Sequence, residues 1–134
     1  MESKALRPLA VVTGASSGIG LELARCAAEH GYDLILAADT PLDHAVSAMQ
    51  QLGAQVEAVQ AELASREGVD QLLAAVKGRT VDALMANAGH GLGGAFLDQD
   101  FDDIQHVIDT NITGTIYLLH HMACLLYTSP SPRD

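Results

Sequence analysis

The sequence predicts an α/β fold, a doubly wound parallel sheet, because short apolar runs alternate with amphipathic stretches along most of its 134 residues. Three of four apolar runs are each followed by a helical pattern that ends at a glycine. A glycine-rich turn joins the first run to the first helical pattern. Alternation of this kind requires helical crossovers between parallel strands, and we expect one domain because no linker or internal repeat interrupts it.

The first strand and helix are defined by a change in periodicity. Leu9 to Val12 is a continuous apolar run, which is typical of a strand covered on both faces. Apolar residues then recur at helical spacing at Ile19, Leu23 and Cys26–Ala27, and Gly31 provides the stop. We therefore expect a strand, a turn and a helix that packs through this apolar face.

The next elements repeat the pattern twice. Residues 34–38 form a second apolar strand that ends at Asp39, and a helix over 41–52 follows, with proline at its start and glycine after its end. A third strand over 56–59 precedes a helix over 65–77. That helix carries its apolar residues on one face, at Val69, Leu72, Leu73 and Val76.

The last third of the chain predicts a fourth strand over 81–86, a glycine-rich loop over 90–98 and a long helix over 101–122. Isoleucines repeat every four residues along this helix, and we expect this stripe to lie in the core. The stripe comprises Ile104, Ile108, Ile112 and Ile116.

Composition excludes several classes of function. The net charge is −10, so we expect no nucleic-acid partner, because phosphate backbones are bound by clustered Lys and Arg. No apolar run approaches the ~20 residues of a membrane helix, and the start of the chain lacks a secretory signal pattern, so we expect no membrane. Two cysteines make no disulfide framework, and we expect a cytoplasmic protein.

The turn from Thr13 to Gly20 has the pattern T-G-x-x-x-G-x-G between an apolar strand and a helix. Glycines let the backbone approach a phosphate, and unpaired N–H groups at the helix start face its negative charge. We predict a dinucleotide site here, the alternative being an ordinary strand-to-helix turn. The residues predicted to hold the phosphates are Gly14, Ser16, Ser17, Gly18, Ile19 and Gly20.

Asp39 ends the second strand, nineteen residues after Gly20. A carboxylate at this point accepts hydrogen bonds from the ribose 2′- and 3′-hydroxyls and repels a 2′-phosphate. No Arg occupies this position or the one before it, so NAD is favoured over NADP. The alternative is an exposed acid in an Asp-Thr-Pro turn.

Three motifs together resemble the short-chain dehydrogenase/reductase family: TGASSGIG, then Asn87-Ala88-Gly89, then Asn111 in Asn-Ile-Thr-Gly. The resemblance implies a Rossmann-like sheet with strand one central, strands two and three on one side and strand four on the other. It implies that Asn87, Ala88 and Gly89 support the sheet beside the adenosine side of the cofactor. It also implies that Glu62 meets the adenine amino group beside Leu63, although the family more often has Asp at position 62.

The resemblance further implies an oxidoreductase that moves hydride between a nicotinamide cofactor and an alcohol or ketone. The substrate would be a small molecule, and the parent enzyme a homo-oligomer. Asn111 would be the catalytic-site residue present here, holding a kinked turn and a water that connects to the catalytic Lys. Asn is a poor residue for a helix interior, which fits such a role, and the alternative is a tolerated polar residue on the helix face.

The family's catalytic Tyr-x-x-x-Lys pair is missing from this sequence. Tyr32 is followed four residues later by Leu, Tyr117 by His and Tyr127 by Ser. No tyrosine is therefore placed to exchange the reacting proton with a lysine beside it. We expect this chain to be catalytically inactive, as a fragment of such an enzyme, and the alternative is a non-catalytic nucleotide-binding module.

Six histidines raise the question of a metal site. His120 and His121 are adjacent and point to different sides of a helix, and no histidine pair at helical spacing has an acid to complete a site. We expect no metal. His90, in the loop that borders the substrate side, is interpreted as a solvated loop residue.

Residues 124–134, CLLYTSPSPRD, resemble the in-frame translation of a sequencing adapter. The alternative is a natural disordered tail. We therefore expect a dinucleotide-binding portion over residues 1–123, truncated after the helix that follows the fourth strand, and a non-native tail over 124–134.

Overall fold

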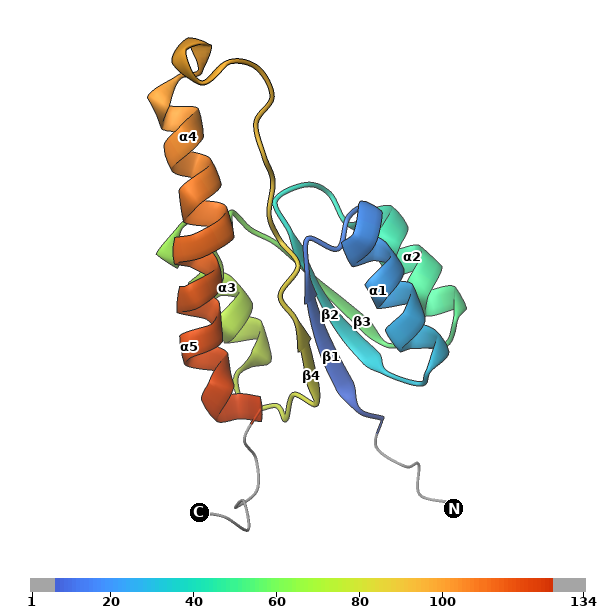
Figure 1. Cartoon of the computed structure of the whole chain (residues 1–134). Helices are drawn as coiled ribbons and strands as arrows, with labels where there is room; N and C mark the ends of the chain where they lie inside the picture. Colours follow the sequence, from blue (N-terminus) through green and yellow to red (C-terminus); the bar gives the residue numbers. More distant parts are fainter. Residues whose placement is uncertain (1–6, 127–134) are drawn as a thin grey trace, which may run out of the picture.

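The computed structural model describes residues 7–126, in which four parallel strands form one sheet with helices on both faces (Figure 1). The strand order β3-β2-β1-β4 confirms both the fold class and the predicted position of the first strand. β1 pairs with β2 and with β4, and β2 also pairs with β3. The strands are β1 (Leu9–Thr13), β2 (Asp33–Ala38), β3 (Val56–Gln60) and β4 (Ala83–Met85).

The helices divide the core into two layers. α1 (Gly18–Glu29) and α2 (Asp43–Gln51) cover one face of the sheet, and α3 (Arg66–Val76) and α5 (Thr115–Leu126) cover the other. Successive side chains of a strand point to opposite faces, so β1 and β2 need apolar residues at every position. This double burial explains why these strands are continuous apolar runs in the sequence.

α1 packs on the sheet mainly through small residues, Gly20 and three alanines, and only part of the predicted apolar face is buried. Ala27 is buried and Leu23 is half-buried against the core, whereas Ile19 is 73% exposed and Cys26 is exposed. Small residues let the helix backbone approach β1 closely, which larger side chains would prevent. The buried alanines are Ala24, Ala27 and Ala28.

The predicted long helix is interrupted by a wider turn. α4 (Phe101–Ile108) leads into a π-helical segment over Asp109–Gly114 and then into α5. The helix also ends at Leu126 and not at residue 122, so Cys124 to Leu126 are helical and Leu125 packs against the core. The remainder of the predicted tail, residues 127–134, lies outside the described residues.

Most of the isoleucine stripe of this segment faces outward, which contradicts its prediction as core. Ile108, Ile112 and Ile116 are 39%, 53% and 60% exposed, and Ile104 is half-buried. The buried row is a different one, Thr110, Gly114, Leu118 and Met122, which also repeats every four residues. In this segment the backbone comes closest to its neighbours at Gly114, and this contact turns the row that contains Gly114 inward.

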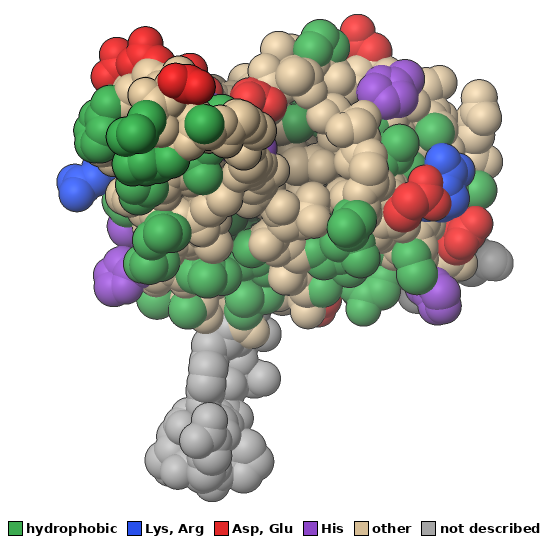
Figure 2. Space-filling model, turned by 45° about the horizontal axis from the view of Figure 1, so that its top comes forward, with side chains coloured by type: hydrophobic (Ala, Val, Ile, Leu, Met, Phe, Trp, Pro, Cys, Tyr) green, Lys and Arg blue, Asp and Glu red, His purple; other side chains and the backbone are tan. Residues whose placement is uncertain are grey.

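The outward isoleucines add to an apolar surface on the side of the molecule that carries α4 and α5 (Figure 2). Phe96, Leu97 and Phe101 are also exposed, at 71%, 91% and 65%. Within residues 7–126, none of the helices is both long enough and apolar enough to cross a bilayer.

Candidate functional site

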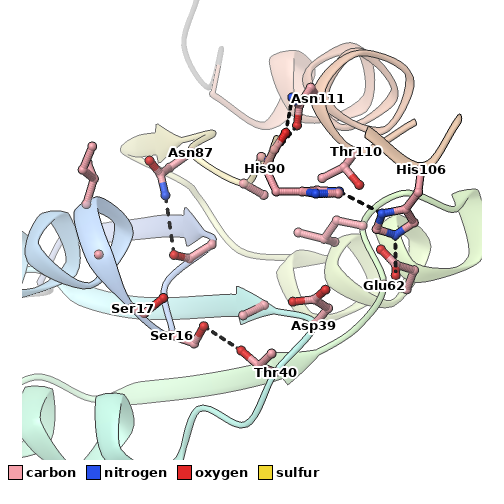
Figure 3. Close-up of a pocket in the computed structure, with 17 residues that line it drawn as sticks. Ser16, Ser17, Asp39, Thr40, Glu62, Asn87, His90, His106, Thr110 and Asn111 are labelled. Atoms are coloured by element: carbon pink, nitrogen blue, oxygen red, sulfur yellow. Dashed lines mark hydrogen bonds and ion pairs between the residues drawn. The ribbon is translucent and has the colours of Figure 1, made fainter. Parts of the chain in front are cut away.

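A cleft of about 630 Å³ opens at the carboxyl ends of the strands (Figure 3). In parallel α/β sheets this edge is where ligands bind, and the volume suits a small molecule or part of a dinucleotide. The segments that line it follow each of the four strands, and a further wall comes from the α4–π segment. The predicted residues that line it are Gly14, Ser16, Ser17, Gly18, Ile19, Asp39, Glu62, Leu63, Asn87, Ala88, Gly89 and Asn111.

The turn between β1 and α1 leaves its backbone donors available. Gly14 and Gly18 have φ angles of +67° and +57°, the left-handed region that favours glycine. Ser17 is the N-cap of α1, but its side chain accepts no hydrogen bond from the first turn. By contrast, Ser65 at the start of α3 accepts a hydrogen bond from the Gly68 amide. The start of α1 is thus a helix N-terminus without a side-chain cap, open to an anion.

Gly20 is the one predicted phosphate residue that does not line the cleft. It is buried, and a Cβ built there would overlap the carbonyl oxygen of Gly14 and lie 2.6 Å from Asn87 Nδ2. Its place in the motif therefore follows from packing between the turn and β4, since no side chain fits between them.

Thr13 joins the ends of β1 and β4. Its buried hydroxyl oxygen accepts hydrogen bonds from the backbone amides of Asn87 and Ala88, both at 2.9 Å. The Asn87 side chain adds a further hydrogen bond between the same two residues, because its Nδ2 donates to the Thr13 carbonyl at 3.3 Å. These bonds fix the Asn87-Ala88-Gly89 segment against the glycine-rich turn and set the width of the cleft there.

The end of β2 supplies an acid and a hydroxyl. Asp39 is exposed to the cleft, and Thr40 Oγ1 donates to Ser16 Oγ at 2.7 Å, which ties this end to the glycine-rich turn (Figure 3). In the part of the chain that the structure describes, no lysine or arginine lines the cleft. Any phosphate bound here is held by backbone donors and hydroxyls.

The turn after β3 is clamped between two glycines. A Cβ on Gly68 of α3 would overlap the Glu62 carbonyl oxygen, and a Cβ on Gly114 would overlap the Leu63 carbonyl oxygen. The Glu62 side chain is left exposed, and its Oε1 accepts from the Ala64 amide at 3.0 Å. The backbone of this turn is fixed from both sides, while the carboxylate faces the cleft.

Asn111 lies in the π-helical segment and binds the loop after β4. Its Nδ2 donates to the His90 carbonyl at 2.8 Å, and its Oδ1 accepts from the His90 amide at 2.9 Å. A Cβ on Gly89 would lie 2.9 Å from Asn111 Oδ1, so the loop passes close to the side chain. The amide pairs with two backbone groups of one residue, which explains a side chain of this kind inside the helix.

The sequence analysis missed a chain of three side chains across the cleft. His90 Nε2 lies 2.8 Å from His106 Nδ1, and His106 Nε2 lies 3.0 Å from Glu62 Oε2 (Figure 3). His90 is exposed in its loop, as predicted, but its ring also pairs with His106. The signal available in the sequence was weak, because the three residues come from three separate elements.

The charges in this chain support each other. The hydrogen bond to Glu62 raises the pKa of His106 above its ordinary value of 6.5, burial opposes this, and the charges of Glu62, Asp39 and Asp109 add to it. Burial raises the pKa of Glu62, but the hydrogen bonds from His106 and Ala64 and the nearby histidine charges outweigh it. The net pKa of Glu62 lies below 4.5.

Thr110 is a further lining residue that the sequence analysis missed. It is only 8% exposed, and its Oγ1 has no hydrogen-bond partner among the described residues. A buried hydroxyl is normally paired, so this atom is an exception in the packing of the cleft wall.

Within residues 7–126, no group of three or more His, Cys, Asp or Glu side chains is arranged to hold a metal ion. His106 uses both ring nitrogens in the chain described above, so neither is directed at a shared ion.

Comparison with protein-family models gives a match to short chain dehydrogenase over residues 8–131. A relative from Synechocystis sp., a 3-oxoacyl-[acyl-carrier-protein] reductase, is 33% identical over 130 residues, which cover 93% of this chain and 53% of the relative.

Two solved structures share the fold at 27% identity. L-sorbose reductase from Gluconobacter frateurii, complexed with NADPH and L-sorbose, has a TM-score of 0.82 and is matched over 90% of this chain and 48% of its own. A 3-oxoacyl-[acyl-carrier protein] reductase from Brucella melitensis, in complex with NAD, has a TM-score of 0.81 over 97% and 53%. The chain thus spans about half the length of the relatives it matches.

Proposed function

The chain belongs to the short-chain dehydrogenase family, and we propose on this premise that its cleft binds a nicotinamide adenine dinucleotide, NAD(H) in preference to NADP(H). The observation that carries the proposal is the start of α1, a glycine-rich turn without a side-chain cap that opens into the cleft. A pyrophosphate at this point would accept hydrogen bonds from the free backbone N–H groups of Gly18 and its neighbours.

The preference for NAD(H) is supported by the end of β2. Asp39 would accept hydrogen bonds from both ribose hydroxyls, and a 2′-phosphate would meet a carboxylate with no basic side chain lining the cleft. Repulsion between the Asp39 carboxylate and a 2′-phosphate would disfavour NADPH, whereas the neutral ribose hydroxyls of NADH would donate hydrogen bonds to the same carboxylate.

The order of the strands sets the direction of the cofactor. With the pyrophosphate at β1 and the ribose at β2, the adenine base would lie at the end of β3, beside Glu62 and Leu63. Asn87 to Gly89, after β4, would support the sheet beside the adenosine side of the cofactor, with Asn111 behind that segment.

The parent reaction we propose is transfer of hydride between the cofactor and an alcohol or ketone of small size. The bound nicotinamide supplies the hydride chemistry. The residues of this chain bind and orient: Asn87 braces the glycine-rich turn, and Asn111 holds the His90 backbone at the cleft wall. The 134 residues hold no Tyr-x-x-x-Lys pair, so we propose that this chain alone does not exchange the reacting proton.

A titration of the 134-residue chain with NADH, followed by nicotinamide fluorescence, tests the binding proposal. We expect saturable binding of NADH and about tenfold weaker binding of NADPH, the equivalent of one unfavourable charge contact of about 1.4 kcal/mol. Asp39→Asn should reduce the ratio of the NADPH dissociation constant to the NADH dissociation constant. Asp43→Asn, at an exposed acid on α2, is the control. Equal affinity for both cofactors would contradict the assigned preference, and no binding of either would contradict the function.

A second candidate is a nucleotide-binding module without catalysis, which the missing Tyr-Lys pair favours. Both candidates bind NADH and neither is expected to convert a substrate. A turnover assay therefore distinguishes both of them from an active enzyme. NAD-dependent oxidation of a panel of alcohols by this chain, above the rate of a Gly20→Ala control, would contradict the proposed inactivity.

A further inference from the structure

The chain Glu62–His106–His90 crosses the cleft at the end where the proposed function places the adenine base. It links three separate elements: the turn after β3, α4 and the loop after β4. Both distances, 2.8 Å and 3.0 Å, are those of ordinary hydrogen bonds. The inference that follows rests on the proposed function.

The direction of donation in this chain is fixed by the carboxylate. An ionised Glu62 only accepts, so His106 Nε2 carries a proton and donates to it. In neutral His106 the other nitrogen, Nδ1, then accepts from His90 Nε2–H. When His106 gains a proton, Nδ1 becomes a donor and His90 must take the opposite tautomer. One extra proton therefore fits the chain, whereas two would set N–H against N–H.

The surroundings of His106 favour that extra proton. Three acids face it: Glu62 from the turn after β3, Asp39 from the end of β2 and Asp109 from the following helical turn. Against these acids stands one group of the opposite charge type, His90. A positive charge on His90 would disfavour a charge on His106. The charged form of His106 is thus more stable than that of an isolated histidine, and its pKa is raised.

The Glu62 carboxylate retains accepting capacity beyond these bonds. Oε1 accepts from the Ala64 amide and Oε2 from His106, which leaves lone pairs on both oxygens. The 6-amino group of adenine can donate to such an oxygen, whereas the 6-oxo group of hypoxanthine only accepts and is repelled. When His106 is charged, the negative charge of the carboxylate is neutralised by the imidazolium.

We propose that His106 is a positioning residue that determines base specificity: it holds Glu62 toward the purine and makes the choice between a 6-amino and a 6-oxo purine depend on pH. At high pH the carboxylate with neutral His106 selects adenine. At low pH the imidazolium–carboxylate pair discriminates less between the two bases, because its negative charge is cancelled.

Paired titrations of the 134-residue chain with NADH and with nicotinamide hypoxanthine dinucleotide, its deaminated form, test this proposal. The two ligands carry the same charge, so pyrophosphate electrostatics cancel in the ratio of their dissociation constants. We expect the ratio to favour NADH by about tenfold near pH 8 and by about threefold or less near pH 5.5, as for one hydrogen bond to a charged group. A ratio that does not change over this range overturns the inference, even where both ligands bind.

His106→Gln keeps a neutral donor at this position and removes the titration. In this variant the preference for NADH over the hypoxanthine dinucleotide should stay high and constant from pH 5.5 to pH 8. His120→Gln, at an exposed histidine on α5, should behave as the wild type. A pH-dependent ratio that persists in His106→Gln overturns the inference. If neither ligand binds at any pH, the proposed function fails and this inference fails with it, an outcome distinct from binding with a flat ratio.

Discussion

Single atoms at the glycine-rich turn decide which of its residues face a ligand and which hold the turn in place. Gly14 and Gly18 adopt left-handed backbone conformations, whereas Gly20 has an ordinary conformation and no space for a side chain. Glycine in this motif therefore meets two physical requirements. The first two positions need a left-handed backbone conformation, and the third needs room for the Gly14 carbonyl and the Asn87 side chain to come close.

Gly20→Ala should abolish measurable NADH binding, because its new Cβ would overlap the Gly14 carbonyl and displace Asn87. Overpacking of this kind costs about 1–3 kcal/mol of folding stability, so circular dichroism must accompany the titration. Gly93→Ala is the matched control, since a Cβ there meets nothing within 4 Å. Unchanged affinity in Gly20→Ala would show that the turn does not need this approach.

The His106–Glu62 pair should stabilise the fold over a defined pH window. The pKa of His106 is raised in the folded state, so its contribution is complete below pH 6.5 and is lost as the pH rises through the folded value. The pKa of Glu62 is lowered, so its contribution is present above pH 4.5 and is lost as the pH falls through the folded value. The pair therefore contributes most between these limits.

Urea unfolding of wild type and His106→Gln should differ more at pH 6 than at pH 8.5. Both side chains are more than a third exposed, at 39% and 47%, so the difference should not exceed about 1 kcal/mol. In a Glu62→Gln background the substitution should have no pH-dependent effect. A larger difference at pH 8.5 than at pH 6 would reverse the assigned sign.

At the scale of elements, the segment from α4 through α5 shows what periodicity can and cannot predict. Two rows of the segment repeat every four residues, and hydrophobicity favoured the isoleucine row over the row that contains Thr110 and Gly114. The buried row is set by the close contact between Gly114 and the Leu63 carbonyl. That contact joins residues about fifty positions apart, so no local pattern contains it.

Leu118→Ala and Ile116→Ala test this assignment. Leu118 is 3% exposed, and its truncation should lower the free energy of unfolding by about 2–5 kcal/mol. Ile116 is 60% exposed, and its truncation should cost less than about 1 kcal/mol. Similar losses in both variants, measured by urea unfolding, would mean that the isoleucine row is buried in solution.

Most of the fold and part of the site could be predicted from the sequence. The strands and the face of α3 followed from apolar runs and glycine stops, because these features are local, whereas the strand order came from the family resemblance. The glycine-rich turn and Asp39 were found as motifs at strand ends, and the other predicted lining residues, from Glu62 to Asn111, came from the resemblance. His106 and Thr110 were not, because only the packed α4–π segment brings them to the cleft.

The whole molecule combines a negative charge with a cleft that we propose binds an anion. The net charge is −10, and the cleft is lined by Asp39 and Glu62 with no basic side chain among the described residues. Long-range forces therefore repel a dinucleotide, and only short-range contacts at the helix start attract it.

Raising the salt concentration should tighten NADH binding, in contrast to a site built from lysines. We expect the dissociation constant to fall by about twofold to threefold between 20 mM and 300 mM NaCl, as screening shortens the reach of the repulsion. Titrations with sodium sulfate at matched ionic strength control for competition by chloride. Weaker binding at high salt would indicate an unrecognised basic contact to the phosphates.

The clamped turn after β3 limits how this site could be redesigned. Its backbone is wedged between Gly68 and Gly114, so insertions or bulkier residues at either glycine would push the whole wall outward. The freedom to recruit a different base lies instead in two replaceable side chains, Glu62 and His106, which stand on that rigid support. Engineering the chain toward a synthetic cofactor should therefore begin by varying those two positions together and leave the scaffold beneath them untouched.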